Sequence, residues 1–333
     1  MNGKKIAVIG SGGWGCAVAV MLSDKGNDVT LWSWKEEESE AIRKNGENKE
    51  FLPGVKIDER IIHLTCALSC VSDKDLIVLA VPSRAVRSTA RAMAEFVRCG
   101  TPIVILSKGL EDKTLKTMSE VVSDEIKKSV CVALSGPSHA EEVARKIPTA
   151  VVAACKDTEI AKFVQEVFMC PSFRVYTNDD ILGVELGGAL KNVIALCAGI
   201  TDGIGFGDNT KAALMTRGIK EISRLGKAMG ANEGTFYGLA GIGDLIVTCT
   251  SMHSRNRRAG ILIGQGKTLK EALDTVHMVV EGVYSSSAAY ELSKKMNVEM
   301  PIIKKAYEVL FENLNPKDAV ISLMKRDRKD EIV

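Results

Sequence analysis

The stretch Lys5-Ile-Ala-Val-Ile9-Gly10-Ser-Gly12-Gly-Trp-Gly15 decides the fold of this 333-residue chain. A short run of β-branched residues leads directly into the pattern GxGxxG, and an amphipathic segment follows as far as Gly26. In a strand, loop and helix in this order, Gly10 permits a tight turn, Gly12 lets the backbone approach a pyrophosphate, and Gly15 allows close packing of helix on strand. The helix N-terminus adds unpaired N–H groups and a positive dipole end. The pattern therefore predicts a dinucleotide-binding loop.

Strand-like runs and helical stretches alternate through the first half of the chain. The further strands are expected at residues 28–32, 75–81, 102–107, 130–134 and 149–154. Strands separated by helices need crossover connections, which produce a mostly parallel sheet covered on both faces. We therefore expect residues 1–180 to form an α/β, doubly wound (Rossmann-type) domain that binds a dinucleotide.

The pattern changes to helices after about residue 180. They are expected at residues 181–199, 211–229, 255–264, 270–276, 282–295 and 301–312. Residues 181–333 are accordingly predicted to form an all-α domain packed against the sheet domain, with Lys191 near the junction. Ligands most often bind in clefts between domains, so this second domain is expected to carry the substrate and catalytic residues.

Composition and charge exclude several classes of partner. The chain is 46% apolar and 26% charged, and its 44 Lys and Arg against 42 Asp and Glu give a formal net charge of +2. Such a balance provides no global field that would favour nucleic acid or an anionic membrane. Nine cysteines, an odd number without a CxxC pair, are typical of free thiols in a reducing compartment.

No segment of the sequence is typical of export or of membrane insertion. MNGKK leads directly into the first strand without the apolar core of a signal peptide. The longest apolar stretch contains Glu185 and Lys191, which argues against a membrane span of roughly 20 residues. We expect a cytoplasmic protein without stable membrane insertion.

Lys191 is a single cation within the apolar run ILGVELGGALKNVIALCAGI. A charge buried among apolar side chains costs several kcal/mol unless it is paired or loses its proton, and enzymes obtain a lysine acid or base in this way. The alternative is a lysine whose stem covers a helix face while its ammonium reaches water. A dinucleotide pattern on one side of Lys191 and a basic SRNRR segment on the other favour the catalytic interpretation.

The end of the second strand bears on the choice of coenzyme. An acid that binds the adenosine ribose of NAD is expected roughly 20 residues after the glycines, but the chain there reads Trp32-Ser33-Trp34-Lys35, and the next carboxylate, Glu36, is assigned to the following helix. The missing acid and the nearby Lys35 favour NADP, whose 2′-phosphate needs a cation, although Lys35 could also be a solvated loop lysine. Trp34 could cover the adenine or fill the hinge of the loop.

Two loops follow strands at the sheet edge where ligands bind. Ser107-Lys108-Gly109 comes after one strand and Gly136-Pro-Ser-His-Ala140 after the next. Because the carboxyl ends of parallel strands share an edge, Ser138 and the backbone amides are expected to face one crevice. Each loop alone could be an ordinary connection. His139 is a rival acid or base, and it could equally cap or pack at the start of its helix.

A second pair of motifs predicts an anion site in the helical half. Ser254-Arg-Asn-Arg-Arg258 begins a helix with Ser254 at the capping position, and a helix N-terminus with arginine suits a phosphate. A cap beside a solvated basic face is the alternative. Asp244 in Gly241-Ile-Gly-Asp244 could orient Lys191, contact a substrate hydroxyl or only close the turn. No cluster has metal-ligand spacing, and no metal is expected.

Seven segments together resemble the bacterial-type glycerol-3-phosphate dehydrogenases, which act with NAD or NADP. They are GSGGWG, LSKGLE, LSGPSHAEEV, GVELGGALKNVIALCAGITDG, GLAGIGDLIVTCTS, SRNRRAG and VVEGV. The resemblance covers nearly the whole chain in the same order. It implies reversible hydride transfer between NAD(P)H and dihydroxyacetone phosphate, giving sn-glycerol 3-phosphate for phospholipid synthesis. NADP(H) is favoured and NAD(H) is possible.

The resemblance also implies roles for individual residues. It makes Lys191 the proton donor and acceptor. Positions that would line the substrate site are Lys108, Gly136, Ser138, Lys191, Asp244, Ser254, Arg255 and Asn256. Positions that would contact the coenzyme, together with the glycine loop Gly10, Ser11, Gly12 and Gly15, are Gly13, Trp14, Trp34, Lys35, Lys108, Ala140, Arg255, Val279 and Glu281.

The chain departs from the family at two of these positions. The family commonly has serine at Gly13, which removes a possible hydroxyl contact to the pyrophosphate, although Ser11 is adjacent. It commonly has a basic or polar residue at Trp34, so the NADP preference rests on the absent acid and on Lys35.

Two other functions remain open at this point. One is a related two-domain β-hydroxyacid or 6-phosphogluconate-type dehydrogenase, which would oxidise hydroxyacids and not reduce a ketose phosphate. The other is a catalytically silent NAD(P)H sensor, which would need neither Lys191 nor SRNRR. The resemblance further leads us to expect a homodimer.

Overall fold

A computed structural model describes residues 3–57, 62–64, 67–127, 129–328 and 330–331. The first half of the chain contributes the strands of one sheet. They are β1 (Lys5–Ile9), β2 (Asp28–Trp32), β3 (Ile62–Leu64), β4 (Leu76–Leu79), β5 (Pro102–Ile105), β6 (Val130–Ser135), β7 (Thr149–Ala154) and β8 (Phe173–Asn178). One sequence observation, the thiol at Cys66, lies outside the described residues.

The sheet is mostly parallel and doubly wound. Its order is β3-β2-β1-β4-β5-β6-β7-β8, and β6 with β7 is the one antiparallel pair among the described strands. The order reverses between β1 and β4, and the register brings the ends of three strands together by pairing Ile9 with Trp32 and with Leu79. A crevice outside the carboxyl ends of the strands at such a reversal is where open α/β sheets bind ligands.

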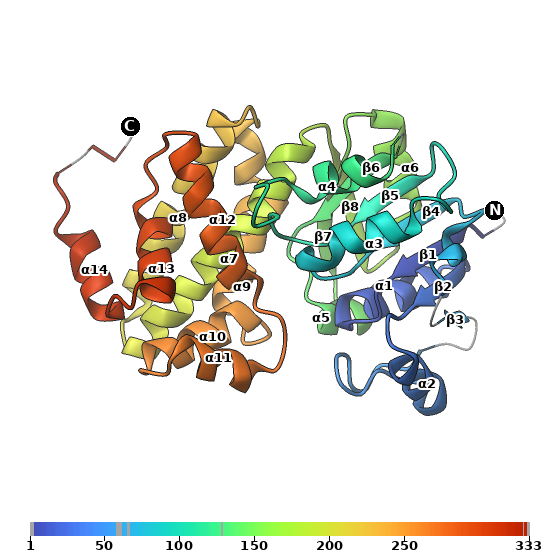
Figure 1. Cartoon of the computed structure of the whole chain (residues 1–333), viewed down its shortest axis with the longest axis horizontal. Coiled ribbons are helices and arrows are strands. Elements are labelled where there is room, and N and C mark those ends of the chain that lie inside the picture. The colour runs from blue at the N-terminus through green and yellow to red at the C-terminus, as the bar shows by residue number, and fades with distance from the viewer. Residues whose placement is uncertain (1–2, 58–61, 65–66, 128, 329, 332–333) are drawn as a thin grey trace.

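Helices cover both faces of this sheet (Figure 1). They are α1 (Gly13–Asp24), α2 (Glu36–Asn45), α3 (Val86–Met93), α4 (Met118–Glu125), α5 (Ala140–Ala144) and α6 (Thr158–Phe168), with the 3-10 turns η1 (Leu68–Val71) and η2 (Ser83–Ala85). Alternate residues of β1 enter different cores, since Ile6 and Val8 pack in one apolar cluster and Ala7 and Ile9 in another. Burial on both faces explains why this strand is an unbroken apolar run.

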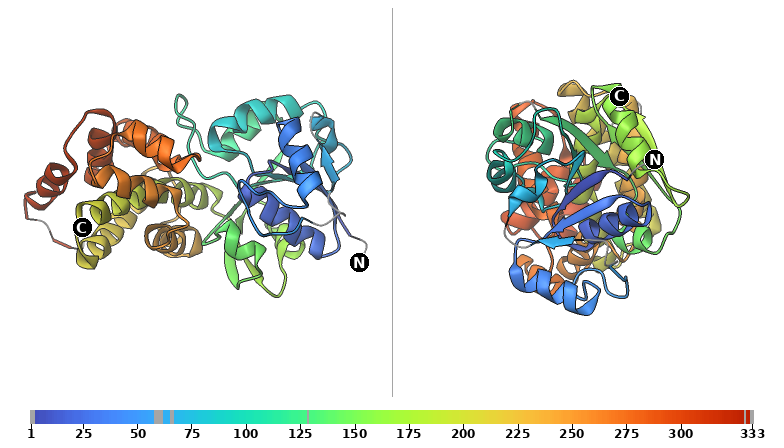
Figure 2. Two further views of the ribbon diagram at one scale, coloured as in Figure 1. Left: turned by 90° about the horizontal axis from the view of Figure 1, so that it is seen from below. Right: turned by 90° about the vertical axis from the view of Figure 1, so that its right-hand side faces the viewer.

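The second half is helical and lies beside the sheet half along the long axis of the molecule (Figure 2). It consists of α7 (Ile181–Ile204), α8 (Asp208–Ala228), η3 (Glu233–Tyr237), the π-helix η4 (Leu239–Gly243), α9 (Asp244–Thr250), α10 (Arg255–Gly264), α11 (Leu269–Val276), α12 (Glu281–Lys295), α13 (Pro301–Phe311) and α14 (Pro316–Met324). By length and composition α7 could cross a membrane, but 89% of its most apolar window is buried inside the protein. It is the central helix around which the others pack (Figure 1).

Glycines let α7 and α10 touch backbone to backbone. A Cβ at Gly199 of α7 would lie 2.1 Å from the Arg257 carbonyl oxygen, and one at Gly260 of α10 would lie 2.1 Å from the Leu196 carbonyl oxygen. Gly203 and Gly264, one turn further along each helix, meet the partner backbone in the same way. The two glycine pairs therefore fix the position of α10 relative to α7.

The fold class expected from the sequence is confirmed, and several element boundaries are as expected. β1, β2, β7 and α10 have the expected bounds. The strand expected at 75–81 is shorter, and α7 continues five residues beyond Gly199, because that glycine is a helix contact and not a stop signal. The sequence analysis missed β8, whose alternating burial is typical of an edge strand, and the short helix α9.

Replacing Gly199 with alanine should destabilise the protein by about 3 kcal/mol, since the new methyl group must push the backbones of α7 and α10 apart. Gly207→Ala is the control, because no heavy atom lies within 4 Å of a Cβ at that position, and its cost should stay within about 1 kcal/mol. Urea denaturation of both variants measures the difference. Equal stabilities would show that α7 and α10 are not held at backbone contact.

Candidate functional site

The glycine loop joins β1 to α1 with the geometry that a pyrophosphate requires. Gly10 has φ +119°, and a Cβ at Gly15 would lie 1.9 Å from the Gly10 carbonyl oxygen, so neither position accepts a side chain. By contrast, a Cβ at Gly12 would meet no heavy atom within 4 Å. Gly12 caps α1 without a side-chain hydrogen bond, and the first N–H groups of the helix remain available to an anion.

The surroundings of Gly13 explain why this chain has glycine where the resembled family commonly has serine. A Cβ there would lie 2.5 Å from the Phe51 carbonyl oxygen and 3.8 Å from the Cβ of Ala140. A serine would therefore require the 46–57 segment to move. Ala140, at the start of α5, therefore lies next to the glycine loop. Trp14 packs its ring against the sheet core.

The residues after β2 provide an exposed aromatic ring and a cation. The side chain of Trp34 is 71% exposed, so it does not fill the hinge of the loop, and Lys35 Nζ lies 5.2 Å from its ring centroid. The Ser11 hydroxyl donates to Ser33 and Glu38. The sequence analysis did not single out Glu38, because it belongs to the first turn of α2.

A buried carboxylate joins two lysines at the centre of the molecule. Lys191 on α7 donates to Asp244 Oδ1 and, at 2.6 Å, to Thr248 Oγ1. Lys108, in the loop after β5, donates to Asp244 Oδ2 at 2.6 Å and to the Gly136 carbonyl at 3.1 Å. Asp244 is 1% exposed and Lys191 is 6% exposed. Of the roles left open for Asp244, the geometry matches the one that orients Lys191.

The cluster shifts the proton affinities of its members. Burial lowers the pKa of Lys191 to about 8, with the ammonium of Lys108 adding to the effect and Asp244 opposing it. Burial alone would raise the pKa of Asp244, but the two ammonium groups outweigh it and hold that pKa below its usual value. At neutral pH Asp244 is therefore ionised, and the Lys191 ammonium is close to releasing its proton.

The loops at the sheet edge surround this cluster. Gly136, with φ +145°, accepts from both Lys108 and the Ser138 hydroxyl. A Cβ at Gly188 of α7 would lie 2.9 Å from Ser135 Oγ and at ordinary contact distance, 3.5 Å, from the stem of Lys108, so this glycine lets α7 approach the end of β6. His139 Nε2 is buried without a partner, and burial, then the charge of Lys191, lowers the pKa of this imidazole. The lowered pKa favours the neutral imidazole at pH 7.

The SRNRR segment divides into structural residues and one candidate anion ligand. Ser254 caps α10 by accepting from the Arg257 amide, as expected from the sequence. Arg257 pairs with Asp202 at 2.8 Å, and Asn256 links Asn192 of α7 to the Gly282 amide of α12. These side chains hold helices together.

Arg255 is the arginine of this segment that the sequence analysis placed in the anion site. Burial lowers the pKa of its guanidinium, and the nearest opposing charges are those of Glu281 and Glu141. Glu281, at the start of α12, accepts from the Ser83 amide at 3.1 Å and from its hydroxyl at 2.5 Å. This carboxylate thus connects the helical half to the loop after β4. Val279 lies two residues before Glu281 in the chain.

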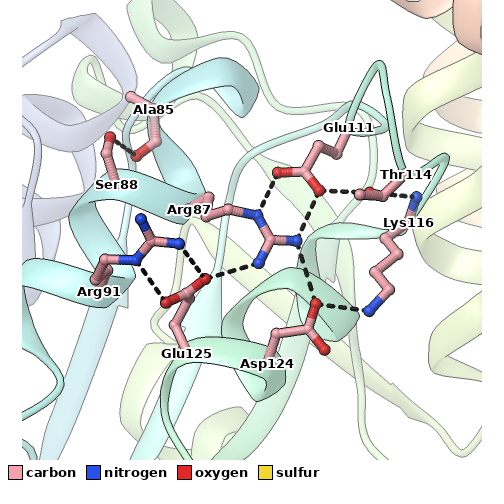
Figure 3. Close-up of polar contacts among 9 residues, drawn as sticks. All are labelled: Ala85, Arg87, Ser88, Arg91, Glu111, Thr114, Lys116, Asp124 and Glu125. Atoms are coloured by element: carbon pink, nitrogen blue, oxygen red, sulfur yellow. Dashed lines mark hydrogen bonds and ion pairs between the residues drawn. The ribbon is translucent and has the colours of Figure 1, made fainter.

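A network of charges supports the loop that carries Lys108 (Figure 3). Arg87 of α3 binds Glu111 through two nitrogens, at 2.6 and 2.7 Å, and also contacts Asp124 and Glu125 of α4. Glu111 lies three residues after Lys108, so the network fixes the far side of this loop against α3 and α4. On the near side, Leu110 enters the core of the helical half.

Glu185 completes the connection between the halves. Its carboxylate, on α7, accepts from both the amide and the hydroxyl of Ser119 in the first turn of α4. Burial raises the pKa of Glu185 to about 7. This bond, the Thr248 contact and the Ser83 contact were all missed by the sequence analysis, because each joins residues that are far apart in the chain.

Comparison with known proteins gives one consistent family. A family model for the N-terminus of NAD-dependent glycerol-3-phosphate dehydrogenase matches residues 5–161, and the model for its C-terminus matches residues 180–321. The chain is 56% identical to glycerol-3-phosphate dehydrogenase [NAD(P)+] of Fusobacterium nucleatum subsp. nucleatum over 98% of each chain. It is 55% identical to the protein of that name from Moorella thermoacetica, over 99% of this chain and 98% of the relative.

A solved structure supports the same assignment. The crystal structure of glycerol-3-phosphate dehydrogenase from Coxiella burnetii superimposes with a TM-score of 0.94 at 37% identity, covering 98% of this chain and 100% of that chain.

Asp244→Asn should lower the free energy of unfolding by about 3–5 kcal/mol, because the buried Lys191 ammonium and the partly buried Lys108 ammonium lose their shared counter-charge. The pKa of Lys191 should then fall below 8, so the folded variant gives up a proton that the unfolded chain keeps, and its stability rises with pH in that window. The deficit relative to wild type should be larger at pH 6 than at pH 8.5. Urea denaturation measures it, with the exposed Asp208→Asn as control, and a pH-independent deficit would contradict the charge assignment.

Proposed function

The chain belongs to the NAD-dependent glycerol-3-phosphate dehydrogenase family, and from that premise we propose that its lysine pair around Asp244 is the centre at which it interconverts dihydroxyacetone phosphate and sn-glycerol 3-phosphate. The protein is an NAD(P)-dependent oxidoreductase of a small phosphorylated substrate. The observation that carries the assignment of the centre is the buried Lys191 ammonium, held by Asp244 and Thr248 with its pKa lowered to about 8.

Lys191 is the proposed general acid for reduction of the ketone. When bound, the reduced nicotinamide supplies the hydride to the carbonyl carbon, and negative charge develops on the carbonyl oxygen. The Lys191 ammonium stabilises that oxygen and then transfers a proton to it; in the reverse direction the neutral amine accepts the proton. A pKa of about 8 keeps both protonation states accessible near neutral pH.

Asp244 and Lys108 act on Lys191 through charge and geometry. Asp244 holds the ammonium in one orientation, and Lys108 limits how far Asp244 can raise the pKa of Lys191. Lys108, Gly136 and Ser138 are proposed to line the substrate site beside it. Ser254, Arg255 and Asn256 are proposed to form its phosphate end, where Arg255 provides the charge and Asn256 holds the N-terminus of α10 in place.

The coenzyme is proposed to lie along the glycine loop. Gly10, Ser11, Gly12, Gly13, Trp14 and Gly15 would face the pyrophosphate, and Trp34 and Lys35 the adenosine end. The proposed contacts nearer the substrate are Lys108, Ala140, Arg255, Val279 and Glu281. In this division residues 1–180 provide most of the proposed coenzyme contacts, and residues 181–333 contribute Lys191, Asp244, the phosphate end and the remaining coenzyme contacts.

We further propose that the protein works in the cytoplasm as a homodimer, and that it supplies glycerol 3-phosphate for phospholipid synthesis. Free cysteines among the described residues agree with a reducing compartment.

Lys191→Ala should reduce the turnover of dihydroxyacetone phosphate with NADPH or NADH by at least about 10²- to 10³-fold, since the developing charge loses its donor. In wild type, kcat/KM for ketone reduction should fall about tenfold per pH unit above pH 8, because the neutral amine cannot donate. Oxidation of glycerol 3-phosphate needs that amine, so its rate should rise with pH up to the same value. Coenzyme absorbance follows both directions.

Lys270→Ala, on the exposed face of α11, is the matched control and should leave these rates unchanged. A folded Lys191→Ala variant with near wild-type turnover would remove Lys191 from the chemistry.

A preference for NADPH over NADH is also proposed, and its support is the exposed Lys35 beside Trp34. Lys35→Ala should weaken NADPH binding about fivefold, as expected for one exposed ion pair of about 1 kcal/mol, and leave NADH binding unchanged. Titration calorimetry with each coenzyme measures this, with the exposed Lys44→Ala as control. An equal loss for both coenzymes would mean that Lys35 does not contact the 2′-phosphate.

A further inference from the structure

The Glu38 carboxylate lies against the glycine loop, although Glu38 belongs to α2 and not to the end of β2. Its Oε1 lies 3.0 Å from Ser11 Oγ, and Ser33 Oγ donates to Oε2 at 3.0 Å. The two hydroxyl oxygens are themselves 2.8 Å apart. Ser11 is 4% exposed and Ser33 is 2% exposed, so the carboxylate is anchored to two buried groups while Glu38 itself remains partly accessible.

The two serines define where that carboxylate lies. Ser11 belongs to the glycine loop, and Ser33 is the first residue after β2. In doubly wound dinucleotide-binding domains, the acid that accepts from the adenosine ribose lies at the end of the second strand and faces the glycine loop. The chain has no acid among residues 32–35. Glu38 brings one to the same place from the first turn of α2.

The anchor of Glu38 is rigid and its charge reaches the loop. The Ser11 carbonyl accepts from Asn48 Nδ2 at 2.7 Å and from Cys16 Sγ at 3.0 Å, and these hydrogen bonds hold the loop in place. Burial raises the pKa of the Cys16 thiol to about 12, and the charge of Glu38 adds to that rise. The Glu38 carboxylate therefore lies beside the loop that leads into α1.

Glu38 and Lys35 present opposite charges to the same end of the coenzyme. A cation at Lys35 attracts a 2′-phosphate, whereas a carboxylate repels it and accepts a hydrogen bond from a free 2′-hydroxyl. We propose that Glu38 is a coenzyme-discriminating residue, which restrains the preference for NADPH and keeps NADH usable. This inference rests on the proposed location of the coenzyme at the glycine loop.

The test is Glu38→Gln, which removes the charge and keeps an oxygen that accepts from a serine hydroxyl. Binding is measured by titration calorimetry with NADPH, NADH and adenosine 2′,5′-bisphosphate, the last of which reports on the adenosine end alone. NADPH and the bisphosphate should bind about tenfold more tightly, as expected from loss of a like charge a few ångströms away. NADH binding should stay unchanged or weaken.

Glu37→Gln is the matched control, because Glu37 is exposed in the same helical turn and its loss changes the net charge equally. An equal gain in NADPH affinity in Glu37→Gln would show that the effect depends only on net charge, and it would overturn the proposal. So would unchanged NADPH binding in Glu38→Gln when Lys35→Ala weakens it. If neither Glu38→Gln nor Lys35→Ala changes any affinity, the proposed coenzyme location is wrong as well.

A double variant that restores a carboxylate near the glycine loop tests the proposal if Glu38→Gln is unstable. Ser33→Asp combined with Glu38→Gln moves the carboxylate to the end of β2. NADPH binding should then return to the wild-type value or weaken further, whereas NADH binding should be kept. Tighter NADPH binding in this double variant would contradict a role for a carboxylate at this position.

Discussion

The Asp244 carboxylate, shared between Lys191 and Lys108, is the interaction on which the rest of the site depends. A buried ammonium without a counter-charge tends to lose its proton, and a buried carboxylate without one tends to gain a proton. Placed together, they stay ionised, while burial still keeps the pKa of Lys191 at about 8. The two lysines come from different halves of the chain, so this one carboxylate connects the sheet half to the helical half.

Several weaker connections maintain that junction. Glu281 binds Ser83, and Glu185 binds Ser119. Each pairs a carboxylate of the helical half with a backbone amide and a hydroxyl of the sheet half, which satisfies buried polar groups without a second buried ion pair. The glycine contacts between α7 and α10 then fix the SRNRR segment relative to Lys191. The distance between the SRNRR segment and Lys191 is thus set by helix packing.

The sequence predicted the parts of the site that are local in the chain. The glycine loop, the cap at Ser254 and the isolated charge of Lys191 each depend on neighbours within a few residues, so the sequence alone is enough to predict them. The role of Asp244 stayed open, because its partners are 53 and 136 residues away. The sequence does not single out Glu38 for a similar reason. Its position in a helix does not predict that its side chain contacts Ser33 at the end of β2.

Direct titration of Lys191 tests this account most directly. The ¹⁵Nζ resonance of this lysine, assigned by comparison with Lys191→Arg, can be followed by NMR from pH 6 to pH 11 in wild type and in Asp244→Asn. We predict titration near pH 8 in wild type and at a lower pH in the variant. Titration near the ordinary lysine value of about 10.4 in both proteins would contradict a buried ammonium balanced by Asp244.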